Sequence, residues 1–150
     1  MAPTPDGMTD VARAIQLALA PVFLLTGIAG MLNVMAGRLA RIIDRGRVLG
    51  EERRDVAASD AAKVSLELHS LERRRHFASV AITACTVAAL LLCTVIATLF
   101  FEVMLNAPLG WLIGSLFMAS TVAMVVGLAF FLREVHLATQ TIRIPVPERK

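Results

Sequence analysis

The stretch GIAGMLNVMAGRLARIIDRGRVL, residues 27–49, changes character in its middle without a residue that would clearly end a helix. Its first half contains glycine, alanine and large aliphatic side chains with one asparagine. Its second half carries four basic side chains: Arg38, Arg41, Arg45 and Arg47. A helix of this kind suits a nucleic-acid groove, a soluble core or the exit from a membrane, and the rest of the sequence decides among the three.

The composition of the chain is typical of a membrane protein. The chain is 57% hydrophobic with a mean hydropathy of +0.70, whereas a globular domain is usually about 45–50% apolar. Three stretches reach the length of about 20 mostly apolar residues that a crossing requires: residues 14–36, 77–101 and 109–132. The last two carry no charged side chain and so lack the polar stripe of a soluble helix. We therefore predict an all-α membrane protein with three transmembrane helices.

The distribution of basic residues predicts the orientation. Residues 37–76 contain ten of the fifteen arginines and lysines, the tail 1–13 has one, and the turn 102–108 has none. Because basic residues in short loops stay on the cytoplasmic side, residues 37–76 and the tail 133–150 are expected in the cytoplasm. The amino terminus and the turn are expected outside a bacterial inner membrane. The first span has no basic segment before it, so we expect it to be retained rather than cleaved.

Residues 37–76 are predicted to form an antiparallel helical hairpin. The first arm has apolar side chains at the spacing of one helical face: Leu39, Ile42, Ile43, Gly46 and Leu49. The second arm repeats this pattern with Val64, Leu68 and Leu71. Gly50 is expected to end the first arm, and Ser59 or Asp60 to cap the second. The stripes contain too few heptads for a self-sufficient coiled coil.

The basic residues predict contacts with anionic lipid headgroups or with a cytoplasmic protein partner. The candidates are Arg38, Arg41, Arg45, Arg73, Arg74, Arg75 and Arg133. Nucleic acid is not expected as a partner, because the accompanying aromatic side chains and base-reading amides are missing. Arg133 and Glu134 are expected to pair with groups at the base of the hairpin, among them Arg38, Arg41 or Asp44.

Small and polar residues within the spans predict helix association. In lipid, close approach of small residues and interhelical hydrogen bonds hold helices together. The candidates are Gln16, Gly27, Gly30, Asn33, Ser115, Ala119, Ala123 and Gly127. They suit packing within a three-helix bundle, contact between copies in a homo-oligomer, or the lining of a pore by the first helix. Pro21 removes one backbone hydrogen bond and permits a bend in that helix.

Residue patterns typical of catalysis are missing from the sequence. No ionisable residue lies deep in a span, where it would mark a transport pathway. His69, His76 and His136 do not follow a metal-ligand spacing, and Cys85 and Cys93 are two helical turns apart. We therefore predict no catalytic, cofactor-binding or metal-binding residue and no enzyme activity. The expected function is a self-associating scaffold or regulatory subunit; the alternative is a homo-oligomeric ion channel or pore.

Two segments resemble a known family. IQLALAPVFLLTGIAGMLNVMAGRLARIIDR, residues 15–45, and FLREVHLATQTIRI, residues 131–144, are similar to the bacterial membrane family called domain of unknown function 2721. The similarity extends over nearly all of Ile15 to Ile144 and is loosest around residues 51–62. This resemblance implies a small integral membrane protein with no assigned reaction, substrate or cofactor.

Overall fold

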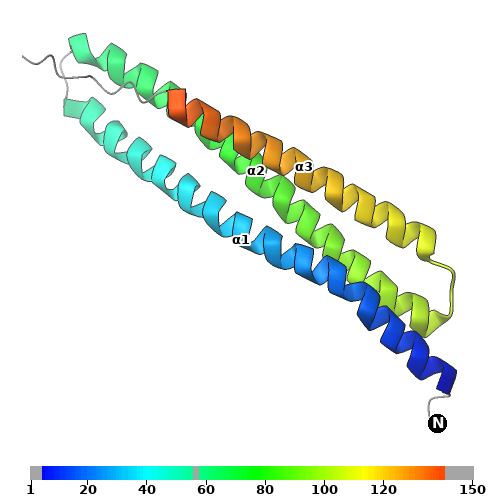
Figure 1. The fold of residues 1–150 in the computed structure, drawn as a ribbon. Helices are drawn as coiled ribbons and strands as arrows, with labels where there is room; N and C mark the ends of the chain where they lie inside the picture. The colour runs from blue at the N-terminus through cyan, green and yellow to red at the C-terminus, as the bar shows by residue number, and fades with distance from the viewer. Residues whose placement is uncertain (1–4, 56–57, 141–150) are drawn as a thin grey trace, which may run out of the picture.

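Three long helices account for nearly all of the described part of the chain. The structure, a computed structural model, describes residues 5–55 and 58–140 (Figure 1). Helix α1 spans Pro5–Asp55, α2 spans Ala58–Leu105 and α3 spans Gly110–Gln140. At about 1.5 Å per residue, the 51 residues of α1 extend roughly 76 Å, while the hydrocarbon core of a bilayer is about 30 Å thick. Much of α1 therefore lies outside any membrane that it crosses.

Apolar side chains cover the outside of the helices. Each of the three helices contains a segment long and apolar enough to cross a membrane, and only 17%, 28% and 11% of these segments is buried within the protein. Large side chains such as Phe23, Leu90 and Val125 are exposed. Soluble monomers rarely expose apolar surface on this scale. The predicted all-helical fold with three helices able to cross a membrane is confirmed.

The helices continue past several predicted ends. Gly50 does not end the first arm, because α1 runs through it to Asp55. A glycine inside a helix costs about 1 kcal/mol relative to alanine, and the good helix formers around it in VLGEERR offset that cost. Helix α2 begins at Ala58, one or two residues before the predicted caps at Ser59 and Asp60.

Parts of both predicted tails are helical. Residues 5–13 belong to α1 and residues 133–140 belong to α3. Helical hydrogen bonding thus extends beyond the stretches that were long and apolar enough to be recognised as spans. Residues 1–4 and 141–150 of the predicted tails, and the side chain of Val64, lie outside the described residues.

Buried positions recur every seven residues on all three helices. On α1 they are Ala14, Pro21, Ile28, Met35, Ile42 and Leu49. On α2 they are Leu71, Ala78, Cys85, Leu92 and Leu99, and on α3 they are Ser120, Gly127 and Glu134. A strict seven-residue repeat is typical of coiled-coil packing, in which helices wind around each other. The short stripe of the first hairpin arm is thus continuous with the repeat of the first span, and the two form one longer heptad repeat on α1.

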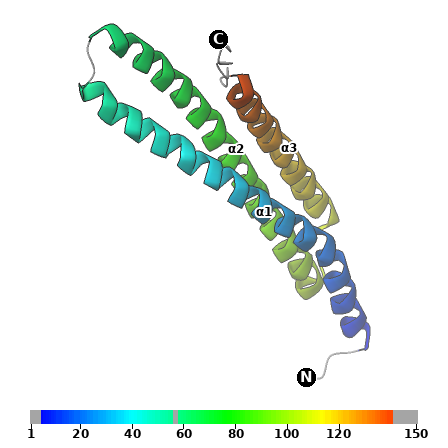
Figure 2. The same cartoon turned by 60° about the vertical axis from the view of Figure 1, so that its left-hand side comes forward.

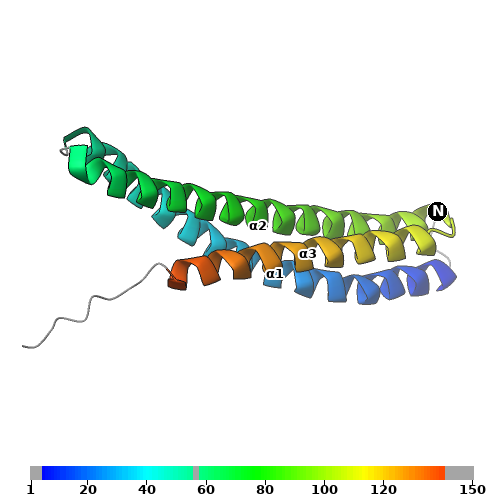
Figure 3. The same ribbon diagram turned by 90° about the horizontal axis from the view of Figure 1, so that it is seen from above.

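Helix α2 lies between the other two helices (Figure 1) and packs against both. In the shared core, Ile28 and Met35 of α1 pack with Cys85 and Leu92 of α2 and with the partly buried Met124 of α3. Figures 2 and 3 show α1 changing direction between its blue and cyan parts. Pro21 lies inside this helix.

Helices α1 and α2 extend beyond the end of α3 (Figures 1 and 2). At the base of this section and along it, Ile42 and Leu49 of α1 form a cluster with Leu71 and Ala78 of α2. We call residues 38–55 and 58–75 the arginine-rich extension. The heptad packing of the three-helix section therefore continues where only α1 and α2 lie side by side.

A tight turn joins α2 to α3 at the opposite end. Asn106 follows the last residue of α2 with a φ of 49°, a left-handed conformation that asparagine tolerates better than most residues. The N–H of Ala107 donates to the carbonyl of Glu102 at 3.3 Å, the hydrogen bond of a common helix-ending motif. Pro108 then stands before α3 and prevents α2 from continuing.

Candidate functional site

The face of α3 that packs on α2 makes close polar and backbone contacts. The Ser120 hydroxyl donates to the carbonyl of Ala88 at 2.9 Å in a buried position. One heptad later, a Cβ added to Gly127 would lie 2.6 Å from Cys85 Sγ and 3.2 Å from the Ala81 carbonyl oxygen. Both features are typical of helix association in lipid, where small residues allow the backbones to approach.

One heptad further, Glu134 joins all three helices. Its side chain is 1% exposed, and Oε2 lies 3.1 Å from Nη1 of Arg38 on α1. Its second oxygen, Oε1, lies 3.1 Å from Nη2 of Arg74 on α2. A buried carboxylate is costly unless it is paired and hydrogen-bonded, and the two guanidinium groups meet that requirement. We call Arg38, Arg74 and Glu134 the buried charge triad.

The sequence predicted one of the two ion pairs of this triad. The expected contact between Glu134 and Arg38 is confirmed, whereas Arg74 had been assigned only to lipid or a partner. A signal for Arg74 was present, because it lies three residues after Leu71 and four before Ala78, the spacing of a core heptad position. Among RRR at residues 73–75, the heptad register singles out the middle arginine.

Arginines in and around the triad lie over aromatic rings. The guanidinium carbon Cζ of Arg38 lies 5.7 Å from the ring centre of Phe131. The Cζ atoms of Arg133 and Arg73 lie 5.2 and 5.9 Å from the ring centre of Phe77. These separations are within the range of cation–π attraction. The interactions place positive charge at the point where the apolar span gives way to the extension.

The triad borders a pocket of about 230 Å³ at the base of the extension. Its lining consists of Arg38, Arg41, Ile42, Arg45, Leu71, Arg74 and Glu134. We call it the arginine pocket, because four of these side chains are arginines. The Nε atom of Arg74 is buried and has no hydrogen-bond partner within the described part of the chain. Such a donor is costly to leave unpaired and is therefore suited to a ligand that accepts hydrogen bonds.

The predicted small and polar residues divide into two groups. Gly127 is buried and Ala123 is partly buried in the shared core. The other six are exposed on the outside of the bundle: Gln16, Gly27, Gly30, Asn33, Ser115 and Ala119. A Cβ added to Gly27 or Gly30 would meet nothing within 4 Å. The described chain therefore uses two of the eight for internal packing and leaves six facing outward.

The arginines also divide. Arg38 and Arg74 are part-buried in the triad. The other five candidates remain exposed: Arg41, Arg45, Arg73, Arg75 and Arg133. Their position on the surface leaves them able to meet lipid headgroups or a protein partner.

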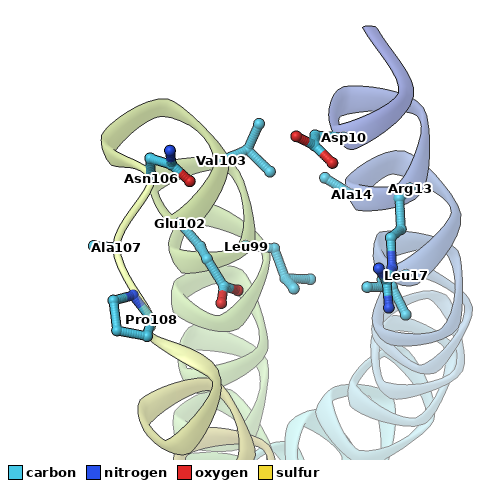
Figure 4. A pocket seen from close by; sticks show the side chains of 10 residues that line it. All are labelled: Asp10, Arg13, Ala14, Leu17, Leu99, Glu102, Val103, Asn106, Ala107 and Pro108. Carbon is cyan, nitrogen blue, oxygen red and sulfur yellow. The ribbon is translucent and has the colours of Figure 1, made fainter. Parts of the chain in front are cut away.

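A second hollow, of about 500 Å³, lies at the turn end of the molecule (Figure 4). Figure 4 shows Asp10 and Arg13 on α1 facing Glu102 and Asn106 on the other side of the cavity. The mixed lining selects no single ligand charge. Among residues 5–55 and 58–140, no group of three or more His, Cys, Asp or Glu side chains is placed to hold a metal ion.

These features define a multi-pass helical membrane protein whose three helices meet at a buried charge triad. Residues 18–144 match the family described as "Protein of unknown function (DUF2721)", and the chain belongs to that family. The matched region includes the whole triad and confirms the family resemblance of the sequence. None of the curated proteins and none of the solved structures compared with this chain matches it.

Proposed function

We propose that this protein is a non-enzymatic, self-associating scaffold or regulatory subunit of a bacterial inner membrane. In this proposal the amino terminus is outside and the carboxyl terminus is cytoplasmic. Residues 37–76 form an antiparallel cytoplasmic hairpin that presents exposed arginines to lipid or to a protein partner. The concentration of basic residues in that segment supports this orientation.

The observation that carries self-association is the outward position of polar and small residues on α1. Gln16, Gly30 and Asn33 are exposed, on the side away from the buried heptad positions Ile28 and Met35. A side-chain amide facing hydrocarbon loses its hydrogen bonds to water. A second copy of the helix would supply partners for Asn33 and close packing at Gly30, as in other membrane helix pairs.

Self-association is tested by fluorescence resonance energy transfer between donor-labelled and acceptor-labelled copies in phosphatidylcholine vesicles. Asn33→Leu and Gly30→Leu are each expected to weaken association at least tenfold, because one removes the amide and the other blocks close approach. Ala97→Leu is the matched control, since it adds similar bulk at an exposed position of α2. A wild-type protein that stays monomeric at every protein-to-lipid ratio, or a control as damaging as Gly30→Leu, contradicts self-association.

The proposed orientation is tested by thiol labelling. In a Cys93→Ala background, Arg47→Cys on the extension is expected to resist a membrane-impermeant maleimide in intact cells and to react after lysis. Ala107→Cys in the turn between α2 and α3 is expected to react in intact cells. The native Cys85 is buried and contributes little background. The reverse pattern of labelling contradicts the orientation.

The same outward residues support a second candidate, a homo-oligomeric pore lined by α1. Gln16 and Asn33 are exposed polar side chains of a membrane-length helix, and in a ring of copies they would face a central path. Planar-bilayer recording separates the two functions. A pore predicts current that Asn33→Leu blocks or makes differently selective, whereas a scaffold predicts no current at either polarity with any of several ions.

A further inference from the structure

Two hollows lie along a seam that α1 forms with α3 and, at the arginine-rich end, also with α2. The first is the arginine pocket. The second is a groove of about 400 Å³ lined by Gly27, Gly30, Met31, Val34, Met35 and Phe131. They meet where Arg38, which lines the pocket, lies over the ring of Phe131, which lines the groove. A ligand that occupied both would have one apolar and one polar part.

The polar end has an excess of positive charge. Both oxygens of Glu134 are already occupied, one by Arg38 and one by Arg74. Arg38, Arg41 and Arg74 line the pocket with Glu134 as its one carboxylate, so these four side chains keep an excess of positive charge after the two ion pairs are made. The buried, unpartnered Nε of Arg74 adds a hydrogen-bond donor in the same pocket. A phosphate group suits such a site, because guanidinium groups recognise its oxygens with paired hydrogen bonds.

The groove at the other end of the seam is entirely apolar. All six of its lining residues are glycines or apolar side chains, and nothing lies within 4 Å of a Cβ added to Gly27 or Gly30. The space is therefore open beside a membrane-length helix, immediately next to the arginines. A free phosphate ion would not use it, whereas the acyl chain of a lipid would.

We propose that this seam binds one anionic phospholipid, with its phosphate in the arginine pocket and one acyl chain in the groove. Basic pockets between transmembrane helices are known to bind the anionic headgroups of lipids. The site lies on the side of α1 that faces α3. Gly30 lines the groove and is also a proposed contact with a second copy, so the two proposals share that residue. Asn33 belongs to self-association alone and Arg41, Arg45 and Gly27 to the lipid site alone, so their variants show which of the two proposals fails. Charge complementarity and the continuity of the two hollows select a phospholipid as the occupant.

The first experiment tests the headgroup. The full chain is purified in maltoside micelles, titrated with palmitoyl-oleoyl phosphatidylglycerol, and examined by native mass spectrometry. One lipid per chain is expected, with phosphatidylcholine binding at least fivefold more weakly. The double variant Arg41→Gln with Arg45→Gln is expected to weaken phosphatidylglycerol binding at least fivefold. These two arginines line the pocket and leave the buried charge triad intact.

The matched control is Arg47→Gln with Arg75→Gln. It removes the same number of charges from the same extension, at exposed residues outside the arginine pocket. Its effect on phosphatidylglycerol binding is expected to stay within twofold. Equal losses in the two double variants would mean diffuse charge attraction and would overturn the proposal, as would equal binding of phosphatidylcholine.

The second experiment tests the groove and separates lipid from free anion. Gly27→Leu fills open space and is expected to weaken phosphatidylglycerol binding at least fivefold, while binding of soluble glycerol 3-phosphate stays unchanged. Gly114→Leu also fills open space, but on another part of the surface. It is expected to leave the binding of phosphatidylglycerol and of glycerol 3-phosphate unchanged. If inorganic phosphate binds as tightly as the lipid and Gly27→Leu has no effect, the ligand is a free anion and the phospholipid proposal is wrong.

Discussion

The interface between α2 and α3 and the outward face of α1 contain the same kinds of residue in opposite surroundings. Gly127 lies against Cys85 and the Ala81 backbone, whereas Gly30 has open space where a side chain would begin. Ser120 is buried and donates to another helix, whereas Asn33 is exposed. Small and polar residues in a membrane helix therefore indicate association without identifying the partner. Between α2 and α3 the partner is a helix of the same chain, and for the outward face of α1 we propose a second copy.

The largest expected effect comes from Gly127→Leu. The new Cβ would be 3.2 Å from backbone atoms of both Ala81 and Cys85. Backbone cannot move aside as a flexible side chain can, so α2 and α3 must separate. Overpacking of this kind costs about 3 kcal/mol of unfolding free energy, measurable by denaturant titration in mixed micelles. Gly114→Leu on the same helix is the control and should change stability by under about 0.5 kcal/mol. Equal stability of the two variants would contradict the described contact between α2 and α3.

The next largest effect is expected for Glu134→Ala. It leaves Arg38 and Arg74 facing each other without the carboxylate that separates them. Breaking a fully buried pair costs about 3–5 kcal/mol; the partial exposure of both arginines reduces the expected loss to about 2 kcal/mol. The same titration measures it, with Glu102→Ala at the opposite end as control. A loss no greater than that of the control would show that the triad does not stabilise the fold.

A smaller loss is expected for Ser120→Ala. The substitution removes one buried interhelical hydrogen bond to Ala88, worth about 1 kcal/mol. Ser115→Ala is the matched control, because that hydroxyl is exposed and donates within its own helix to Leu112. Ser120 lies on the face of α3 that packs on α2, and Ser115 lies on its exposed face. Equal unfolding free energies for the two variants would assign no stabilising role to the bond between α2 and α3.

The smallest effect, and one of opposite sign, is expected for Gly30→Ala in the monomer. Because a Cβ meets nothing there, the substitution should raise the unfolding free energy by about 0.5 kcal/mol through the lower entropy of the unfolded chain. Gly127→Ala, measured in parallel at a dilution that keeps the protein monomeric, should lower it. Destabilisation by both substitutions would mean that α1 has a close internal neighbour at Gly30.

Much of the architecture followed from local properties. Three apolar stretches, the basic residues between the first two, and Glu134 near the end of the third predicted the spans and the contact with Arg38. The second arginine of the triad was missed because Arg73, Arg74 and Arg75 are chemically identical and only the heptad register distinguishes them. Gly50 was misassigned because helix propensity is a weak preference that its neighbours and the packing of Leu49 override.

By itself, the sequence determined that the chain is helical and that three of its segments belong in lipid, because transfer of apolar residues out of water depends on composition and length. Only the tertiary structure decided which small residues touch a neighbouring helix and which arginines enclose a carboxylate. Those contacts depend on how three helices are rotated and aligned relative to one another. That arrangement is set by packing along the whole length of the bundle, so no single stretch of residues specifies it.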